Sequence, residues 1–287
     1  MKNYFALVTF SHTVFALPFA LVGYFLAVHR PQIDFRWQTL VFVLLCMVFA
    51  RNAAMAFNRY IDRDIDGKNP RTATREIPAG VISEQSALLF IILNCLAFTA
   101  VTYFINPLCF YLSPVALLII LGYSATKRFT FLCHFVLGLG LSLAPLGAYL
   151  AAGGGFDILP LLYSGVVLLW VAGFDIIYAI QDEKFDKTLD LNSVPVKLGA
   201  KKSLRLSSIL HIFCAVLAAA ASYAATQIYP EFGWLNYTAT AFFIAMLFYQ
   251  HTLVTPDDLS KVNRAFFTTN GIASLVFGVL VIADLYF

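Results

Sequence analysis

Acidic side chains cluster at the ends of two hydrophobic segments of this chain. One segment ends in NRYIDRDID, which places Asn58, Asp62 and Asp66 at intervals of four residues. Another ends in DIIYAIQDEKFD, with Asp182 and Asp186 at the same interval. The chain has only 16 Asp and Glu residues among 287, so this clustering does not follow from its average charge. Because residues four apart lie on one face of a helix, each segment presents a pair of carboxylates.

Paired carboxylates of this kind predict a site for divalent cations, because like charges at this spacing repel unless a cation lies between them. Mg2+ prefers carboxylate oxygen and usually keeps substrate phosphates as further ligands. We expect Asp62 with Asp66, and Asp182 with Asp186, each to hold one Mg2+, with Asn58 adding a neutral oxygen. A polyphosphate between the two ions would complete the site. The candidates to neutralise its remaining charge are Arg63, Arg71, Arg75, Lys127, Arg128 and Lys197.

Three further residues lie deeper in the same two segments. Arg51 precedes Asn58 by seven residues, and Asp175 precedes Asp182 by seven. A charged side chain within a membrane span is costly and normally faces a cavity or a partner. We expect Arg51 either to bind the carboxylate of a substrate or to form a structural pair with Asp175. Asp175 is a candidate to orient Arg51, to position an acceptor hydroxyl or to receive a proton, and Tyr178 shares a face with Asp182.

Other polar residues in the hydrophobic segments stand alone. We interpret His12, Asn94, His134 and His211 as groups that hydrogen-bond between packed helices, which is common in membranes. The five cysteines form no CxxC pair, and we interpret them as small packing residues. The chain shows no Ser/His/Asp or Cys/His pattern that would indicate a protein nucleophile.

The elements that must position these residues are membrane-spanning helices. Hydrophobic residues make up 60% of the chain and charged residues 12%, against about 25% charged in soluble domains. A helix needs about 20 apolar residues to span a bilayer. About nine such segments are present, so we expect an all-α, polytopic membrane protein. Their approximate centres are Leu17, Leu45, Cys95, Leu117, Leu141, Leu168, Ala215, Ile244 and Val276.

Basic residues predict the orientation of these segments. With nine spans, 16 of the 19 Lys and Arg residues fall on the side of the N-terminus, beginning with Lys2. The other side has only Arg30 and Arg36, while Arg51 lies within a span. Because cytoplasmic connections are rich in Lys and Arg, we expect a cytoplasmic N-terminus and cytoplasmic acidic pairs in an inner or plasma membrane. The same bias means that any single basic residue near the acidic pairs is equally well explained as an ordinary loop charge.

The chain also divides into two similar parts. Two long basic connections, about 65–85 and 183–204, each follow an acidic pair and each contain proline. We expect one transmembrane domain over residues 1–287 with two pseudo-repeats, about 1–130 and 131–287. The similarity fits either an internal duplication or two independent solutions of the same problem.

At NRYIDRDIDGKNPRTATREIPAG, residues 58–80, the chain resembles the UbiA superfamily of intramembrane aromatic prenyltransferases. Asn58, Asp62 and Asp66 match the family signature NxxxDxxxD, and the second aspartate motif matches Asp182 and Asp186. The Asp-x-x-Tyr that precedes this second motif in the family is present as Asp175 and Tyr178. The stretch YSATKRFT, residues 123–130, is similar to the connection between the fourth and fifth helices of the 4-hydroxybenzoate branch. The resemblance covers essentially the whole chain.

The resemblance implies a UbiA-like helical bundle around a central cavity, with a two-Mg2+ site that binds an isoprenyl diphosphate. It also implies transfer of the polyprenyl group to the ring of an aromatic acceptor, beside membrane lipid. The segments RNAAMAFNRYIDRDID and AGFDIIYAIQDEKFD look most like the hydroxybenzoate and futalosine-pathway menaquinone branches. The expected acceptor is therefore an aromatic hydroxy acid, 4-hydroxybenzoate or 1,4-dihydroxy-6-naphthoate, in respiratory quinone biosynthesis. No nucleic acid partner is expected.

Three alternatives compete with this prediction. Another member of the same superfamily would use a different acceptor, such as haem or another lipid. A cation-coupled transporter would also pair membrane acids with arginine, but it predicts acids near mid-membrane and broken helices in both halves. A phospholipid-type phosphotransferase requires a DGxxAR segment, and here Asp66-Gly67 is followed by KNPR.

Overall fold

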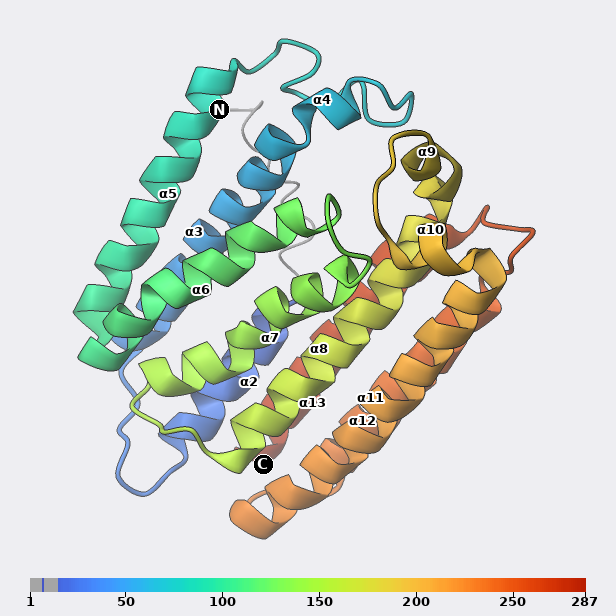
Figure 1. The fold of residues 1–287 in the computed structure, drawn as a ribbon. Helices are drawn as coiled ribbons and strands as arrows, with labels where there is room; N and C mark the ends of the chain where they lie inside the picture. The colour runs from blue at the N-terminus through green and yellow to red at the C-terminus, as the bar shows by residue number, and fades with distance from the viewer. Residues whose placement is uncertain (1–6, 8–14) are drawn as a thin grey trace.

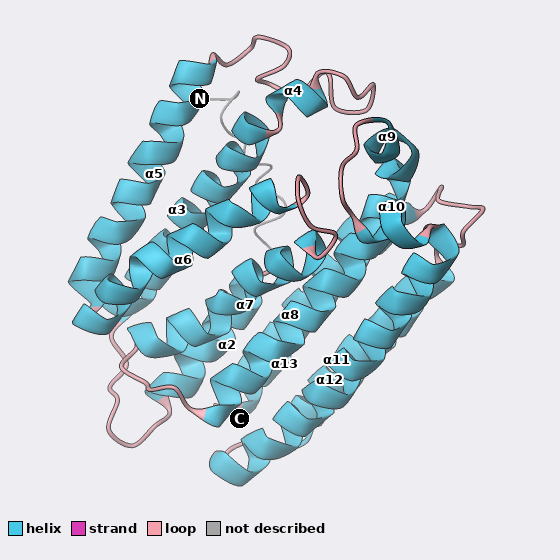
Figure 2. Cartoon of the chain, in the orientation of Figure 1, coloured by secondary structure: helices cyan, strands magenta, loops and turns pink. Residues whose placement is uncertain are grey.

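The computed structural model describes Leu7 and residues 15–287, so Lys2 and His12 lie outside the described residues. Every regular element within the described residues is a helix, and none is a strand (Figure 2). Among the described residues, nine long helices form the body of the molecule, and short helical segments lie in the connections. The long helices are α2 (Leu17–Val28), α3 (Trp37–Ile61), α5 (Glu84–Ile105), α6 (Pro107–Thr126), α7 (Cys133–Ala151), α8 (Ile158–Ala179), α11 (Ala200–Ile228), α12 (Trp234–Thr252) and α13 (Thr269–Asp284). The short segments are α4 (Arg63–Asp66), η2 (Ile180–Asp182), α9 (Glu183–Thr188), α10 (Val194–Leu198) and the π-helical η3 (Arg264–Thr268).

The helices run roughly side by side in one bundle (Figure 1). The most extensive contacts join α7 with α8, α8 with α11, and α3 with α5. The α2 helix packs against α7 and α13, so the described start and end of the chain lie next to each other in the bundle. This arrangement confirms the all-α bundle expected from the sequence.

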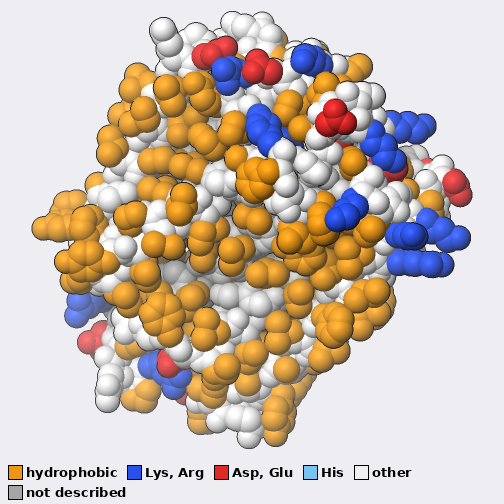
Figure 3. Space-filling view, in the orientation of Figure 1, with side chains coloured by type: hydrophobic (Ala, Val, Ile, Leu, Met, Phe, Trp, Pro, Cys, Tyr) orange, Lys and Arg blue, Asp and Glu red, His pale blue; other side chains and the backbone are white. Residues whose placement is uncertain are grey.

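All nine expected segment centres lie in long helices, but the helices differ in how well they fit a bilayer. Among the described residues, seven helices are long and apolar enough to cross a membrane by length and composition. The other two long helices are α2, which has 12 residues, and α12, which carries Asn236, Gln250 and His251. Leu96, Leu118 and Val216 are exposed on the outside of the bundle, as lipid-facing side chains would be. The space-filling view shows hydrophobic side chains across the middle of the molecule and charged ones gathered towards its ends (Figure 3).

Local chemistry fixes the tight turn between α5 and α6. The side chain of Asn106 accepts a hydrogen bond from the Cys109 amide at 2.8 Å and so caps α6. Pro107 occupies the first position of that helix, where a missing N–H has no cost. The side-chain amide of Asn106 also donates to the Leu150 carbonyl at 2.9 Å, and this bond connects the turn to the end of α7.

Small residues let the helices approach closely, as is usual between membrane helices. A Cβ at Gly138 would lie 2.5 Å from the Leu168 carbonyl oxygen, so α7 and α8 touch backbone to backbone there. A Cβ at Gly23 would lie 2.1 Å from the carbonyl oxygen of Pro145, which joins α2 to α7 in the same way. Around these contacts the core is aromatic, with Trp170 hydrogen-bonded to Asn270 at 2.8 Å. The resulting scaffold holds α3 and α8, which carry the predicted site residues.

Candidate active site

The first acidic group lies where α3 ends. Asp62 follows the last residue of α3, and the side-chain amide of Asn58 donates to Asp62 Oδ2 at 3.4 Å. Asp66 ends the short helix α4, and its amide donates to the Asp62 carbonyl at 2.7 Å. Both carboxylates are buried, at 2% and 4% exposure. The spacing of four residues therefore places both carboxylates in the interior of the protein, at the end of the bundle where α3 ends.

Basic side chains compensate both of these carboxylates. The Lys127 ammonium lies 2.6 Å from Asp62 Oδ2, and Arg128 Nη2 lies 3.1 Å from Asp62 Oδ1. Arg75 Nη1 lies 2.8 and 2.7 Å from the two oxygens of Asp66. Burial raises the pKa of the Asp62 carboxyl, although the positive charges of Lys127 and Arg128 act to lower it. The ionised form of Asp62 thus depends on neighbouring cations.

The second acidic group comes from the other half of the chain, but the ammonium group of Lys127 interacts with both groups. Asp182 closes the 3-10 turn η2 after α8, and Arg71 binds it with two hydrogen bonds, at 3.1 and 2.6 Å. Asn69 donates to the same carboxylate at 3.4 Å. Asp186, on α9, interacts electrostatically with Asp182, Lys127, Arg71 and Asp62. The connection after the first acidic pair therefore reaches across to the second, at the same end of the bundle (Figure 1).

The donor set of this region suits a hard divalent cation. The described residues contain no cluster of three Asp, Glu, His or Cys side chains that could hold a metal by themselves. Mg2+ does not need such a cluster, because it is usually bound by one or two carboxylates together with water and substrate phosphates. Asp62 Oδ1 is buried and has Arg128 Nη2 at 3.1 Å, but it accepts no hydrogen bond of good geometry among the described residues, so it can still coordinate a metal ion. Carboxylate oxygens in two compensated groups therefore fit Mg2+ that arrives with a phosphate ligand.

Deeper in the bundle, Asp175 and Tyr178 lie along α8 below Asp182. The Tyr178 and Phe266 ring centroids lie 4.2 Å apart. The guanidinium carbon of Arg71 lies 5.8 Å from the centroid of the Tyr178 ring. Asp175 Oδ2 lies 2.7 Å from Nδ1 of His134. The expected alternative of an Arg51–Asp175 pair is thus not formed in the structure.

Arg51 instead carries an unpaired charge at the wall of a cavity. Its Nε and Nη2 atoms are buried and have no hydrogen-bond partner among the described residues. A buried cation of this kind is costly unless something pairs with it. Arg51 lies on the wall of a cavity. Its expected role in binding the carboxylate of a substrate stays a prediction.

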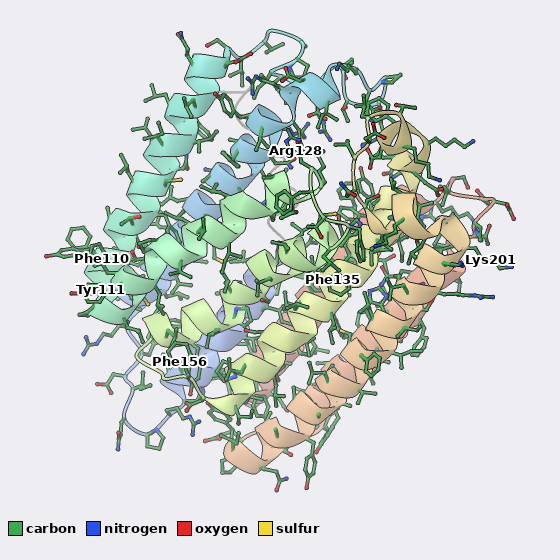
Figure 4. The ribbon with its side chains drawn as sticks, in the orientation of Figure 1. Phe110, Tyr111, Arg128, Phe135, Phe156 and Lys201 are labelled. Atoms are coloured by element: carbon green, nitrogen blue, oxygen red, sulfur yellow. The ribbon has the colours of Figure 1, made fainter. Side chains whose placement is uncertain are left out.

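The cavity has a volume of about 440 Å³ and an apolar wall. Helices α3, α5, α6, α7 and α8 supply most of its lining. Arg51 is the only charged residue among the described residues that line it, and Tyr123 is one of its few polar neighbours. The lining on α3 runs from Val43 to Met55, about 18 Å along the helix. It reaches Phe156 at the opposite end of the bundle from Arg128 (Figure 4).

Two predicted basic residues lie away from the acidic groups. Arg63 Nε pairs with Glu84 at 3.0 Å, and its guanidinium lies 4.8 Å from the ring of Tyr60. The Lys197 ammonium lies 3.8 Å from the ring centroid of Phe131. The structure therefore brings Arg71, Arg75, Lys127 and Arg128 together with the aspartates, but not Arg63 or Lys197.

Sequence reasoning missed three residues of this region. Asn69 donates a hydrogen bond to Asp182 from the connection between α4 and α5, where no periodic pattern could indicate it. Tyr123 lines the cavity beside Arg51, and its position four residues before Lys127 would have placed it on that face. His134 was expected to bond between helices, and it does so, but its partner Asp175 is a predicted site residue.

The aspartates Asp62, Asp66 and Asp182 and their basic partners form a polar chamber at one end of the apolar cavity. A bundle of apolar helices with such a site defines an integral, multi-pass membrane protein that can hold a charged group beside a hydrophobic one. The sequence pattern of the UbiA prenyltransferase family matches residues 16–272. The chain therefore belongs to the UbiA prenyltransferase family, and it is a prenyltransferase. This membership confirms the family resemblance, and it excludes the transporter alternative.

Known proteins support this assignment in both sequence and structure. A 4-hydroxybenzoate octaprenyltransferase of Aliivibrio fischeri is 30% identical over 243 residues, which are 84% of this chain and 82% of that protein. The apo structure of a UbiA homologue from Aeropyrum pernix is 32% identical, with a TM-score of 0.84 over 96% of this chain and 98% of that one. A UbiA homologue from Archaeoglobus fulgidus, solved bound to GPP and Mg2+, shares the fold at 22% identity, with a TM-score of 0.76 over 99% of this chain and 100% of that one.

Proposed function

We propose that this protein transfers a polyprenyl group from polyprenyl diphosphate to the ring of 4-hydroxybenzoate, in respiratory quinone biosynthesis. The observation that carries the proposal is the guanidinium of Arg51, which has two buried nitrogens without a partner among the described residues, at an apolar cavity below two compensated acidic groups. A carboxylate is the natural partner of a buried arginine, because its two oxygens match the guanidinium fork. The relative from Aliivibrio fischeri is named as a 4-hydroxybenzoate octaprenyltransferase, and this acceptor has such a carboxylate.

The diphosphate is proposed to bind between the two acidic groups. Asn58, Asp62, Asp66, Asp182 and Asp186 would hold Mg2+ together with the diphosphate oxygens. Bound Mg2+ would neutralise the diphosphate and so make it a better leaving group. Arg71, Arg75, Lys127 and Arg128, which pair with the aspartates in this structure, would turn part of their hydrogen-bonding capacity to the diphosphate.

The remaining residues are proposed to act on the tail and the acceptor. The apolar cavity receives the first isoprene units and keeps water from the allylic carbon as positive charge develops there. Arg51 binds the acceptor carboxylate, and Tyr178 packs beside the acceptor ring. The ring carbon ortho to the hydroxyl attacks the allylic carbon, and Asp175 receives the proton which that ring carbon loses. In the membrane, the N-terminus and this site face the cytoplasm, as the distribution of basic residues predicts.

A prenylation assay on membranes containing the protein tests this proposal. With Mg2+ and octaprenyl diphosphate, 4-hydroxybenzoate should give a prenylated product, and EDTA should abolish it because the site needs a divalent cation. 1,4-Dihydroxy-6-naphthoate, offered in parallel, is the competing acceptor with a carboxylate. Product from that acid alone would overturn the hydroxybenzoate assignment, and product from neither would overturn the proposed acceptor class.

Variants of the acidic groups complete this test. Asp62→Ala and Asp182→Ala each remove one predicted metal ligand and should abolish turnover. Wild-type amounts of protein in the membrane are required of both variants. Full activity in either one would contradict a site that uses both acidic groups.

A further inference from the structure

His134 contacts both α8 and the connection that follows Asp186. It lies on α7 and is buried, at 3% exposure. Its Nδ1 lies 2.7 Å from Asp175 Oδ2 on α8, and its Nε2 lies 3.3 Å from the amide nitrogen of Val194. Val194 begins α10, in the connection that follows Asp186. One imidazole thus contacts both the proposed proton acceptor and the connection that belongs to the acidic group above it.

These two contacts assign the proton on the ring. The Val194 amide can only donate, so Nε2 must present its lone pair to it. The ring proton therefore lies on Nδ1 and is donated to Asp175. A doubly protonated ring would place two donors against each other at Val194.

Asp175 keeps one oxygen available towards the substrate region. His134 engages Oδ2, and the Asp175 side chain remains 22% exposed. Its chain neighbour Phe174 lines the cavity, as does Tyr123. Tyr123, which lines the cavity together with Arg51, interacts electrostatically with both Arg51 and Asp175. Oδ1 of Asp175, which His134 does not contact, is the candidate oxygen to meet an acceptor.

We propose that His134 is a positioning residue, which orients Asp175 for proton transfer from the aromatic acceptor. The inference rests on the proposed function and adds a residue to it. In the step concerned, the ring carbon bonds to the allylic carbon, and the C–O bond to diphosphate breaks with its electron pair leaving on oxygen. The ring C–H bond then breaks, its electrons restore the aromatic ring, and the proton passes to Asp175. The Nδ1–H bond to Oδ2 holds the Asp175 carboxyl group in one orientation before that transfer, and it leaves Oδ1 to face the ring.

Another buried histidine shows what a packing role looks like in the same protein. His211 bonds to His251 at 2.8 Å and to the Trp170 carbonyl at 3.2 Å, and neither partner is a predicted site residue. His211→Asn is therefore a matched control for the loss of a buried histidine between membrane helices. It should leave kcat within about twofold of the wild type, since it is remote from the reacting atoms.

Substitutions that mimic one ring nitrogen at a time separate positioning from packing. In the membrane assay with 4-hydroxybenzoate and octaprenyl diphosphate, His134→Ala should lower kcat by about 10-fold to 100-fold while KM for the diphosphate stays unchanged. His134→Asn can place an amide N–H near the Nδ1 position and should recover much of this loss. His134→Gln places its amide near the Nε2 position and should not recover it. Equal activity of the Asn and Gln variants would overturn the proposal.

A double-mutant cycle gives the second readout. Asp175→Asn should lower kcat by about 100-fold, because it removes the proton acceptor. If His134 acts through Asp175, His134→Ala should cost less than about twofold in the Asp175→Asn background. A further loss as large as in the wild-type background would show a structural role and overturn the inference. Wild-type turnover in the same membranes reports on the proposed function itself, so the two failures are distinguishable.

Discussion

Charged residues of this site differ in whether the protein itself compensates them. Asp62, Asp66 and Asp182 each have a basic partner within 3.1 Å. Arg51 has none among the described residues, and two of its nitrogens are buried. An uncompensated buried charge destabilises a folded protein unless a ligand pairs with it. At the scale of single residues, the structure therefore singles out Arg51 as the group that awaits an anionic ligand.

The first prediction concerns Arg51→Met, which keeps most of the side-chain volume and removes the charge. KM for 4-hydroxybenzoate should rise by about 30-fold, because hydrogen bonds to a charged group contribute about 2 kcal/mol. KM for the diphosphate should change little. The ligand-free variant should also melt a few degrees higher in detergent, since a buried charge without a partner is gone. Steady-state kinetics and a thermal melt measure the two effects.

Arg63→Met is the matched control for this prediction. Arg63 pairs with Glu84 and Tyr60 on the outer side of α3 and α5, away from the cavity. Its loss should change neither the acceptor KM nor the melting temperature by the amounts expected for Arg51. An Arg51→Met enzyme with an unchanged acceptor KM would show that this guanidinium has a structural role.

At the scale of elements, three connections meet over the cavity and hold one another in place. Arg71, in the connection after α4, bonds to Asp182 after α8. The Asn192 amide, in the connection after α9, donates to the Lys127 carbonyl at 2.7 Å. Lys127 in turn pairs with Asp62 at the end of α3. The site is therefore built from the ends of α3, α6 and α8, and its shape depends on contacts between connections.

This dependence predicts that Arg71→Ala loosens the connection between α4 and α5. The bidentate pair with Asp182 is partly exposed, so its loss should cost about 1 kcal/mol, which corresponds to about fivefold faster amide exchange in residues 68–80. Hydrogen–deuterium exchange with mass spectrometry on the ligand-free protein measures this rate. Lys68→Ala, in the same exposed connection, should leave exchange unchanged. Equal exchange in all three proteins would mean that the connection is held by other contacts.

Sequence reasoning succeeded where the signal is local and failed where it depends on packing. The positions of the helices and the four aspartates follow from hydrophobic length and a four-residue spacing, both of which are properties of a single segment. The pairing of Arg71 with Asp182, and of His134 with Asp175, joins segments far apart in the chain. Helices that are apolar on all sides give no amphipathic pattern to show which faces meet. The internal duplication of the two halves stays a prediction.

At the scale of the whole molecule, the polar chamber and the apolar cavity are stacked along the bundle. The cavity measures about 440 Å³ and is lined by small residues on several helices, such as Ala50, Ala116 and Ala144. Such a wall selects for apolar character and against bulk, because nothing in it recognises one isoprene unit over another. Tail length should therefore be limited by free space along the cavity.

Filling the cavity should consequently discriminate between short and long tails. Ala144→Phe narrows it midway along α7, so kcat/KM should fall by about 10-fold or more for octaprenyl diphosphate and much less for dimethylallyl diphosphate. Ala100→Phe makes the same change on an exposed position of α5 outside the cavity, and it should affect neither substrate. Competition between the two diphosphates in one membrane preparation measures the ratio directly. An Ala144→Phe enzyme that keeps wild-type kcat/KM for both substrates would place the tail outside this cavity, with the long chain leaving the chamber directly into lipid.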